Sequence, residues 1–149
     1  MQSRLSWRED GDAHRREPEV KCLDTDFLVA ILRGKETADR KMFELDREGR
    51  QSTTAISAFE LFYGAYKSNQ RPTNVEKTKA LLERVDVLPF ESDSSELAGE
   101  ILAELSARGD SIDFRDAMIA GIARAHGLSL VTRNKEHFAR IKELKVELW

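Results

Sequence analysis

The chain has 149 residues, 40% of them apolar, a length and composition typical of one folded domain with a sizeable core. Its formal net charge of −3 gives no overall sign of nucleic-acid binding, so any such function must depend on local features. The one cysteine, Cys22, excludes an intrachain disulfide, and no apolar run is long enough to predict a membrane-spanning helix.

Residues 1–19 are almost entirely polar and charged and lack the apolar segment of a signal peptide. We expect them to form a poorly ordered extension that precedes one domain over residues 20–149. The cysteine content agrees with a cytoplasmic location, with no membrane partner expected.

Short apolar runs alternate with longer helical patterns along the rest of the chain. In chain order we predict a strand over 20–24, helices over 25–32 and 36–49, a strand over 51–54, helices over 55–68 and 71–84, a strand over 86–90, helices over 92–109 and 113–127, a strand over 128–132, a short helix over 135–141 and an edge strand over 145–149. This alternation predicts a parallel sheet covered by helices on both faces, with functional sites beyond the carboxyl ends of the strands.

Two helices carry specific packing expectations. The spacing within residues 36–49 predicts that Met42, Phe43 and Leu45 face inward. Residues 113–127 are apolar nearly all round, which predicts a buried helix.

Several polar residues occupy positions where polarity is costly. Asp24 ends the first strand, Glu60 lies among apolar neighbours in the helix over 55–68, and Asp116 lies in the first turn of the buried helix. Thr132 is the last residue of the strand over 128–132 and Asn134 follows it, so all five are expected at one edge of the sheet. Three carboxylates there would repel one another unless a divalent cation neutralised them. A cluster with oxygen ligands alone favours Mg²⁺ or Mn²⁺ over zinc.

Each of these residues also has a purely structural explanation. Asp24 could cap the following helix, Asp26 could complement its dipole, and Asn134 could be a turn residue. Glu60 could form a capping box with Ser57, although Thr53 or Thr54 is better placed to cap that helix. Their common location at one sheet edge favours the joint interpretation as a site.

The candidate site residues and the elements around them lie in four segments, which follow one another along the chain: LDTDFLVAIL (23–32), TAISAFELFYGA (54–65), DFRDAMIAGIARAHGLSLVTRNKEHFARI (113–141) and VELW (146–149). Together they resemble the PIN-domain ribonucleases, specifically the VapC-type toxins of bacterial and archaeal toxin–antitoxin pairs, over residues 20–149. The resemblance implies a PIN-like three-layer α/β/α fold with a mostly parallel sheet of about five strands.

The resemblance implies that Asp24, Glu60 and Asp116 are the acidic metal ligands. Many members have a fourth acidic residue after the LVT strand, where this chain has Asn134, which can offer an oxygen or orient a water but brings no charge. We therefore expect one tightly held ion and a weaker or substrate-assisted second. Asp113, three residues before Asp116, could partly compensate for the missing charge.

Other residues are expected to support the site. Thr25 and Thr132 are expected to hydrogen-bond the ligands. Basic residues near the site could contact phosphates, and they are Arg33, Lys35, Arg115, Arg133 and Lys135. His126 and His137 are interpreted as structural.

The activity that the resemblance implies is Mg²⁺- or Mn²⁺-dependent hydrolysis of an RNA phosphodiester, without a protein nucleophile. The implied partners are the RNA substrate, a VapB-type antitoxin and a second copy in a homodimer. The antitoxin would insert a basic side chain among the carboxylates and lay a helix over an apolar groove. Phe62, Tyr63 and Tyr66 could line that groove or a dimer interface, with core packing expected for two of them.

Alternative functions remain open at this point. The D-x-D of Asp24 and Asp26 fits the signature of a haloacid-dehalogenase-type phosphatase, but Phe27 and Leu28 replace the residues expected next. Asn134 also fits a catalytically inactive PIN-like module that binds RNA or protein. A response-regulator receiver would require adjacent early acids and a late lysine, and Lys135 is only approximately placed for that role.

Overall fold

The computed structural model describes residues 18–149. The extension predicted over residues 1–19 therefore lies outside the described residues, apart from Pro18 and Glu19, which are exposed. No helix within residues 18–149 combines the length and apolar character needed to cross a bilayer.

Every predicted element is present, mostly with shorter bounds. The strands are β1 (Cys22–Leu23), β2 (Ser52–Thr54), β3 (Asp86–Leu88), β4 (Leu130–Val131) and β5 (Val146–Glu147). The helices are α2 (Thr25–Leu32), α3 (Glu36–Asp46), α4 (Ala55–Lys67), α5 (Arg71–Glu83), α6 (Ser92–Ala107), α7 (Phe114–Ala125) and α8 (Lys135–Ala139).

The five strands form one sheet in the order β3-β2-β1-β4-β5, and every neighbouring pair is parallel. The expected parallel α/β sheet is confirmed, with β1 at its centre and the C-terminal strand β5 at an edge. Because parallel strands share one direction, the carboxyl ends of β1 and β4 meet at the same edge, where Cys22 pairs with Leu130 and Leu23 with Val131.

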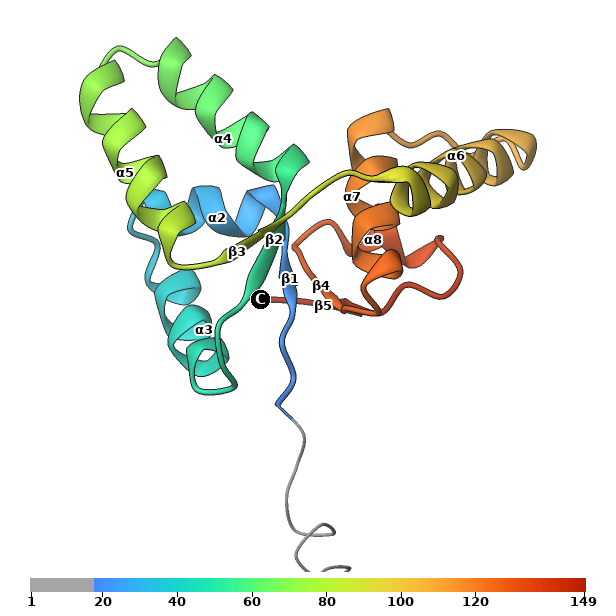
Figure 1. Cartoon of the computed structure of the whole chain (residues 1–149), viewed down its shortest axis with the longest axis horizontal. Helices are drawn as coiled ribbons and strands as arrows, with labels where there is room; N and C mark the ends of the chain where they lie inside the picture. The colour runs from blue at the N-terminus through green and yellow to red at the C-terminus, as the bar shows by residue number, and fades with distance from the viewer. Residues whose placement is uncertain (1–17) are drawn as a thin grey trace, which may run out of the picture.

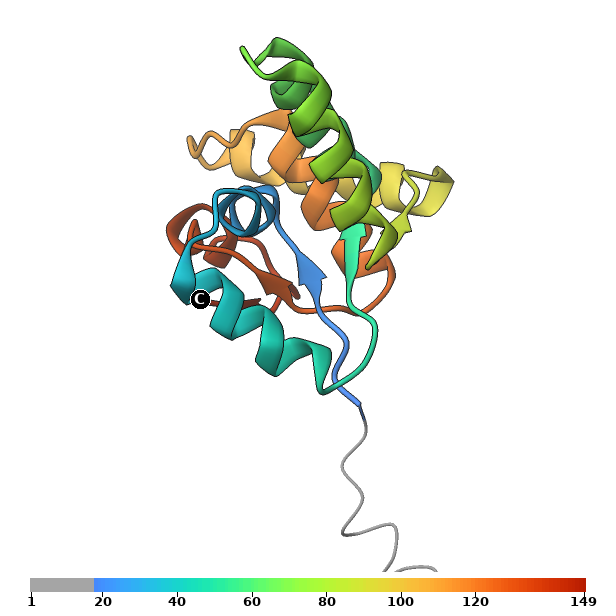
Figure 2. The ribbon, with the colours of Figure 1, turned by 90° about the vertical axis from the view of Figure 1, so that its left-hand side faces the viewer.

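The core consists of two clusters on opposite faces of the sheet. Leu23 and Val131 belong to a cluster that also contains residues of α2, α3, α4 and α5. Cys22 and Leu130 belong to the other cluster, which contains residues of α6, α7 and α8. Successive strand residues point to opposite faces, so this division follows from the pleat. Figure 1 shows the same three layers, with α2 to α5 on one side of the strands and α6 to α8 on the other, and Figure 2 gives the view turned by 90°.

Helix α7 is buried, as predicted. Its residues Ala117, Ile119, Ala120, Ile122 and Ala123 are each at most 1% exposed. The packing of α7 against α6 requires Gly121, because a Cβ there would lie 2.6 Å from the carbonyl oxygen of Ser94 and 2.9 Å from the backbone nitrogen of Ala98. This close packing fixes the first turn of α7 beside the end of the sheet.

The prediction that Phe43 faces inward is wrong, because this side chain is 71% exposed. The buried residues of α3 are Ala38, Met42 and Leu45, a helical i, i+4, i+7 series that leaves Phe43 on the solvent side.

The core packing expected for two of the three α4 aromatics is also wrong. Tyr63 is 54% exposed, Tyr66 is 52% exposed, and Phe62 is only partly buried. The face of α4 that packs inward is formed instead by Ser57, Leu61 and Ala65.

Candidate active site

Asp24 lies at the junction of β1 and α2 and caps the helix. Its Oδ1 accepts a hydrogen bond from the backbone N–H of Thr25 at 2.8 Å, and its Oδ2 accepts one from the hydroxyl of Thr132 at 2.7 Å. Only 5% of the residue is exposed. Since Thr132 directly follows β4, the carboxyl ends of two neighbouring strands build this contact.

The charge of Asp24 is unfavourable in this setting. The pKa of Asp24 is raised to about 7, chiefly by burial, with the charges of Asp26 and Asp116 adding to the effect. The hydrogen bonds from Thr132 and Thr25 act in the opposite direction. A buried carboxylate of this kind is stabilised in its charged form by a cation.

Glu60 is held by a threonine from a different element. Helix α4 is capped by Thr54, whose hydroxyl accepts from the backbone N–H of Ser57, so the alternative capping box between Ser57 and Glu60 is not formed. The hydroxyl of Thr25 donates to Oε1 of Glu60 at 2.9 Å and is also hydrogen-bonded with the hydroxyl of Ser57 at 2.8 Å. Glu60 is therefore fixed to the start of α2 instead of to its own helix terminus.

Asp116 lies in the first turn of α7 and is partly buried. Burial raises its pKa, and the charges of Asp113 and Glu60 raise it further, while His137 and Arg115 lower it. Because the charge of Glu60 acts on Asp116 and that of Asp116 acts on Asp24, the three carboxylates belong to one electrostatic cluster.

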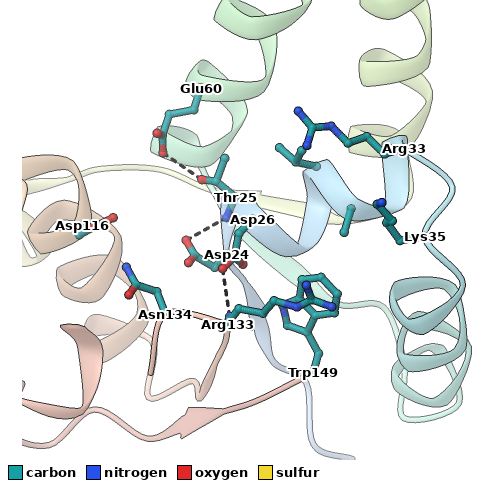
Figure 3. Close-up of a pocket in the computed structure, with 12 residues that line it drawn as sticks. Asp24, Thr25, Asp26, Arg33, Lys35, Glu60, Asp116, Arg133, Asn134 and Trp149 are labelled. Atoms are coloured by element: carbon teal, nitrogen blue, oxygen red, sulfur yellow. Dashed lines mark hydrogen bonds between the residues drawn. The ribbon is translucent and has the colours of Figure 1, made fainter. Parts of the chain in front are cut away.

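A cavity of about 500 Å³ opens at this edge of the sheet (Figure 3). Its lining has an acidic and polar part and a basic part, joined by apolar side chains. The acidic and polar part is formed by Asp24, Thr25, Asp26, Glu60, Asp116 and Asn134, and the rest by Arg33, Lys35, Arg133, Trp149, Val29 and Ala30.

The donor chemistry of the cavity fits a hard divalent cation. Its lining offers carboxylate, hydroxyl and amide oxygens and no sulfur or imidazole, which suits Mg²⁺ or Mn²⁺ better than zinc. Within residues 18–149, no three acidic, histidine or cysteine side chains stand close enough together to hold an ion between them. Since Mg²⁺ usually binds one or two carboxylates and keeps several waters, a closed cage of three side chains is not required.

Asn134 lies beside the carboxylates, at the start of α8. Its backbone N–H donates to the hydroxyl of Thr132 at 3.0 Å, and its side-chain nitrogen lies 2.9 Å from Nδ1 of His137. The hydroxyl of Thr132 therefore connects Asn134 to Asp24.

Asp26 is the residue whose place in this site the sequence did not reveal. Its Oδ2 accepts hydrogen bonds from the hydroxyl of Thr132 at 3.2 Å and from the backbone N–H of Arg133 at 3.0 Å. Its Oδ1 is buried without a hydrogen-bond partner within the described part of the chain. The only sequence signal was its position two residues after Asp24, which also suits a helix-dipole role.

Of the five basic residues expected to contact phosphates, Arg115 and Lys135 lie outside the cavity lining. Arg133 lines the cavity, whereas the guanidinium of Arg115 is hydrogen-bonded to both carboxylate oxygens of Asp113 and lies 3.9 Å from Glu60. Lys135 is exposed at the first turn of α8. Asp113 caps α7, pairs with Arg115 and is not part of the lining, although its charge raises the pKa of Asp116.

The family model of the PIN domain matches residues 21–144. The chain is 34% identical over 127 residues to the tRNA(fMet)-specific endonuclease VapC of Shigella flexneri, a match that covers 85% of this chain and 96% of that protein. It is 32% identical, with the same two coverages, to ribonuclease VapC2 of Haemophilus influenzae.

Solved structures of similar fold include VapBC complexes. VapBC2 from Rickettsia felis, bound to a DNA fragment from its promoter, superposes with a TM-score of 0.82 at 28% identity, over 87% of this chain and 98% of that one. DNA-bound VapBC from Salmonella typhimurium superposes with a TM-score of 0.81 at 32% identity, over 88% of this chain and 98% of that one.

Proposed function

The chain belongs to the PIN-domain family as a VapC-type ribonuclease, the toxin of a toxin–antitoxin pair, and on this basis we propose that it hydrolyses RNA by metal-dependent chemistry at the acidic part of the cavity. The observation that carries this proposal is the setting of Asp24. Its buried carboxyl has a pKa raised to about 7 and shares one cavity with Glu60 and Asp116. Such a cluster is costly for the fold alone and becomes favourable when a cation is bound.

In this proposal Asp24 and Asp116 would hold a Mg²⁺ or Mn²⁺ ion, and Glu60 and Asn134 would offer further oxygen atoms close to it. When bound, the ion would supply Lewis-acid chemistry, which would activate water and stabilise the charge on the leaving oxygen. The hydroxyl of Thr132 fixes one oxygen of Asp24, and the hydroxyl of Thr25 fixes one oxygen of Glu60, so both carboxylates keep a defined orientation. No side chain of this chain needs to act as a nucleophile.

The proposed substrate is transfer RNA, and specifically the initiator tRNA. This proposal is supported by the Shigella flexneri relative and by its Salmonella typhimurium counterpart, which is 33% identical over 127 residues, since both are named for action on tRNA(fMet).

The proposed partner is a VapB-type antitoxin, supported by the toxin–antitoxin complexes among the similar structures. A second cavity of about 280 Å³ adjoins the first and has an apolar part formed by Leu32, Leu61 and Ala65. Both cavities share Arg33 and Glu60, so a helix lying in the second could extend a basic side chain toward the carboxylates. Cytoplasmic location and homodimerisation are part of the same proposal.

The test is cleavage of initiator tRNA by the purified chain, with elongator tRNAs as comparison. We expect cleavage in Mg²⁺ or Mn²⁺ that stops on addition of a chelator. Asp24→Asn, Glu60→Gln and Asp116→Asn should each abolish it while circular dichroism shows a folded protein. Thr132→Val should reduce it by roughly 10- to 100-fold, the usual cost of losing a residue that orients a metal ligand. Cleavage that survives all three acidic substitutions would refute the proposed site.

The second candidate is an inactive module that binds RNA without cleaving it, and Asn134 at the usual fourth acidic position is the observation that favours it. Binding of the same tRNA with no cleavage in either metal would support this candidate. The phosphatase alternative is not retained, because the chain belongs to the PIN family and Asp26 bonds to the segment after β4.

A further inference from the structure

Three basic side chains line the cavity opposite the carboxylates. Arg33, Lys35 and Arg133 form no ion pair within residues 18–149, in contrast to Arg115, which is paired with Asp113. Unpaired cations beside a carboxylate cluster leave this side of the cavity positively charged. A cavity with one acidic and one basic side suits a ligand that carries several negative charges and bridges both, provided a metal ion occupies the acidic side.

Arg133 is held in place at two points. Its backbone N–H donates to Asp26 at 3.0 Å, and its guanidinium lies 3.7 Å from the centre of the Trp149 ring. The Trp149 ring packs edge-on against the fully buried Phe27, with ring centres 5.1 Å apart. Tryptophan is the strongest aromatic partner for a cation, and a stacked guanidinium still presents its N–H groups at its edge.

Figure 3 shows the arrangement that results. Arg133 lies over Trp149 on one side of the cavity, and Arg33 and Lys35 project from the end of α2 and the segment that follows it. Planar guanidinium groups bind phosphate oxygens through pairs of hydrogen bonds, and lysine adds a point charge. The three side chains thus have the chemistry of a phosphate-binding site.

We propose that Arg33, Lys35 and Arg133 bind a backbone phosphate of the RNA that neighbours the cleaved one, and that Trp149 positions Arg133 for this contact. The inference rests on the proposed function, because it assigns the ligand as the RNA backbone. It divides the cavity into an acidic side for chemistry and a basic side for holding the strand. Contacts of this kind position a nucleic acid without reading its sequence.

The first test measures RNA binding without cleavage. In an Asp116→Asn background, the dissociation constant of a single-stranded oligouridylate of about ten nucleotides is measured by fluorescence anisotropy over a range of salt concentrations. Arg33→Ala, Lys35→Ala and Arg133→Ala should each weaken binding several-fold and reduce the slope of log K against log salt by about 0.7 for each lost phosphate contact. Arg47→Ala, which removes an exposed charge at the end of α3, is the matched control and should change neither value.

The second test addresses Trp149. Trp149→Phe keeps an aromatic ring under Arg133 and should retain most of the affinity, whereas Trp149→Leu should weaken binding as much as Arg133→Ala does. The double variant Trp149→Leu/Arg133→Ala should bind no more weakly than Arg133→Ala alone, because the two side chains act through one contact. Melting temperatures of all variants show whether each protein is folded.

The outcomes separate this proposal from the proposed function. Cleavage of tRNA by the otherwise unaltered chain, together with unchanged affinity and salt slope in all three basic variants, would overturn the phosphate site and leave the ribonuclease assignment intact. Additive effects of Trp149→Leu and Arg133→Ala would overturn the positioning role. If the unaltered chain neither binds nor cleaves RNA, both proposals fail. In the active protein, Arg133→Ala should raise KM with little change in kcat, the pattern of lost substrate binding.

Discussion

At the scale of single residues, Asp24 has two effects of opposite sign on the stability of the fold. Its side chain caps α2 and accepts a hydrogen bond from Thr132, both of which stabilise the structure. Its burial raises its pKa to about 7, so its ionised form destabilises the metal-free protein at neutral pH. Residues that serve catalysis commonly carry such a cost in stability.

Asp24→Asn should therefore stabilise the metal-free protein above pH 7 while abolishing RNA cleavage. With the folded-state pKa raised from 3.8 to about 7, the folded protein binds the proton more tightly than the unfolded chain, so stability is lost as pH rises through this window. Asparagine carries no charge to bury, so the gain should be on the order of 4 kcal/mol at pH 8 and under about 1 kcal/mol at pH 4. Urea denaturation in the presence of a chelator measures both values.

The matched control for this prediction is Asp39→Asn, which removes an exposed carboxylate of α3. It should not reproduce the gain at pH 8. An Asp24→Asn protein that is less stable than the unaltered chain at both pH values would contradict the assignment of Asp24 as a costly buried charge.

The sequence singled out Asp24, Glu60 and Asp116 because each interrupts an apolar pattern, Asp24 after a strand, Glu60 within α4 and Asp116 in the first turn of α7. It did not place Asp26 in the site, because the partners of this residue come from the opposite end of the domain. The hydrogen bond from Arg133 to Asp26 spans 107 positions along the chain, and no local pattern reports such a contact. The stacking of Arg133 on Trp149 likewise depends on how the segments after β4 and β5 lie in the folded domain.

At the scale of elements, the close packing of α6 and α7 holds Asp116 in place. Gly121→Ala should destabilise the protein by about 1–3 kcal/mol, because the added methyl group would lie 2.6 Å from a backbone oxygen of α6 and must push the helices apart. The same displacement moves the first turn of α7, so RNA cleavage should fall as well. Urea denaturation and the cleavage assay measure the two effects.

Gly99→Ala in α6 is the control, since a Cβ at Gly99 meets nothing within 4 Å. It should raise the free energy of unfolding by up to about 1 kcal/mol, the difference in helix propensity between the two residues. Equal effects of the two substitutions would show that the contact between α6 and α7 does not carry the predicted strain.

Helical periodicity predicted which segments form helices better than it predicted which aromatic side chains are buried. Helix α2 has its predicted bounds, and the other helices end within a few residues of theirs. Helical spacing placed Phe43 inward, and core packing was expected for two of the three aromatics Phe62, Tyr63 and Tyr66. The neighbouring elements instead cover the faces of α3 and α4 that are formed by Met42, Leu45, Leu61 and Ala65. Which face of a helix is covered depends on how the helix packs against other elements, and the hydrophobic pattern of a single helix carries no information on that packing.

At the scale of the whole molecule, the strand order brings the carboxylates together from distant parts of the chain. Asp24 follows the central strand β1, Thr132 follows its neighbour β4, and α4 and α7 place Glu60 and Asp116 from opposite faces of the sheet. A ligand that joins these groups should therefore stabilise the complete domain.

Adding Mn²⁺ should raise the melting temperature of the unaltered chain by on the order of 5 °C at a metal concentration well above the dissociation constant. The gain arises because the ion binds the folded protein and offsets the repulsion among Asp24, Glu60 and Asp116. Asp24→Asn and Asp116→Asn should lose most of the gain. A shift of the same size in both variants would mean that the ion binds elsewhere.

The most direct measurement is an anomalous difference map from crystals of the full chain grown with Mn²⁺. The expected result is a peak in the cavity beside Asp24 and Asp116, within coordinating distance of at least one carboxylate oxygen of each. A preparation that cleaves RNA in Mn²⁺ but shows no peak at these carboxylates, or shows its peak at another place, would contradict the central claim.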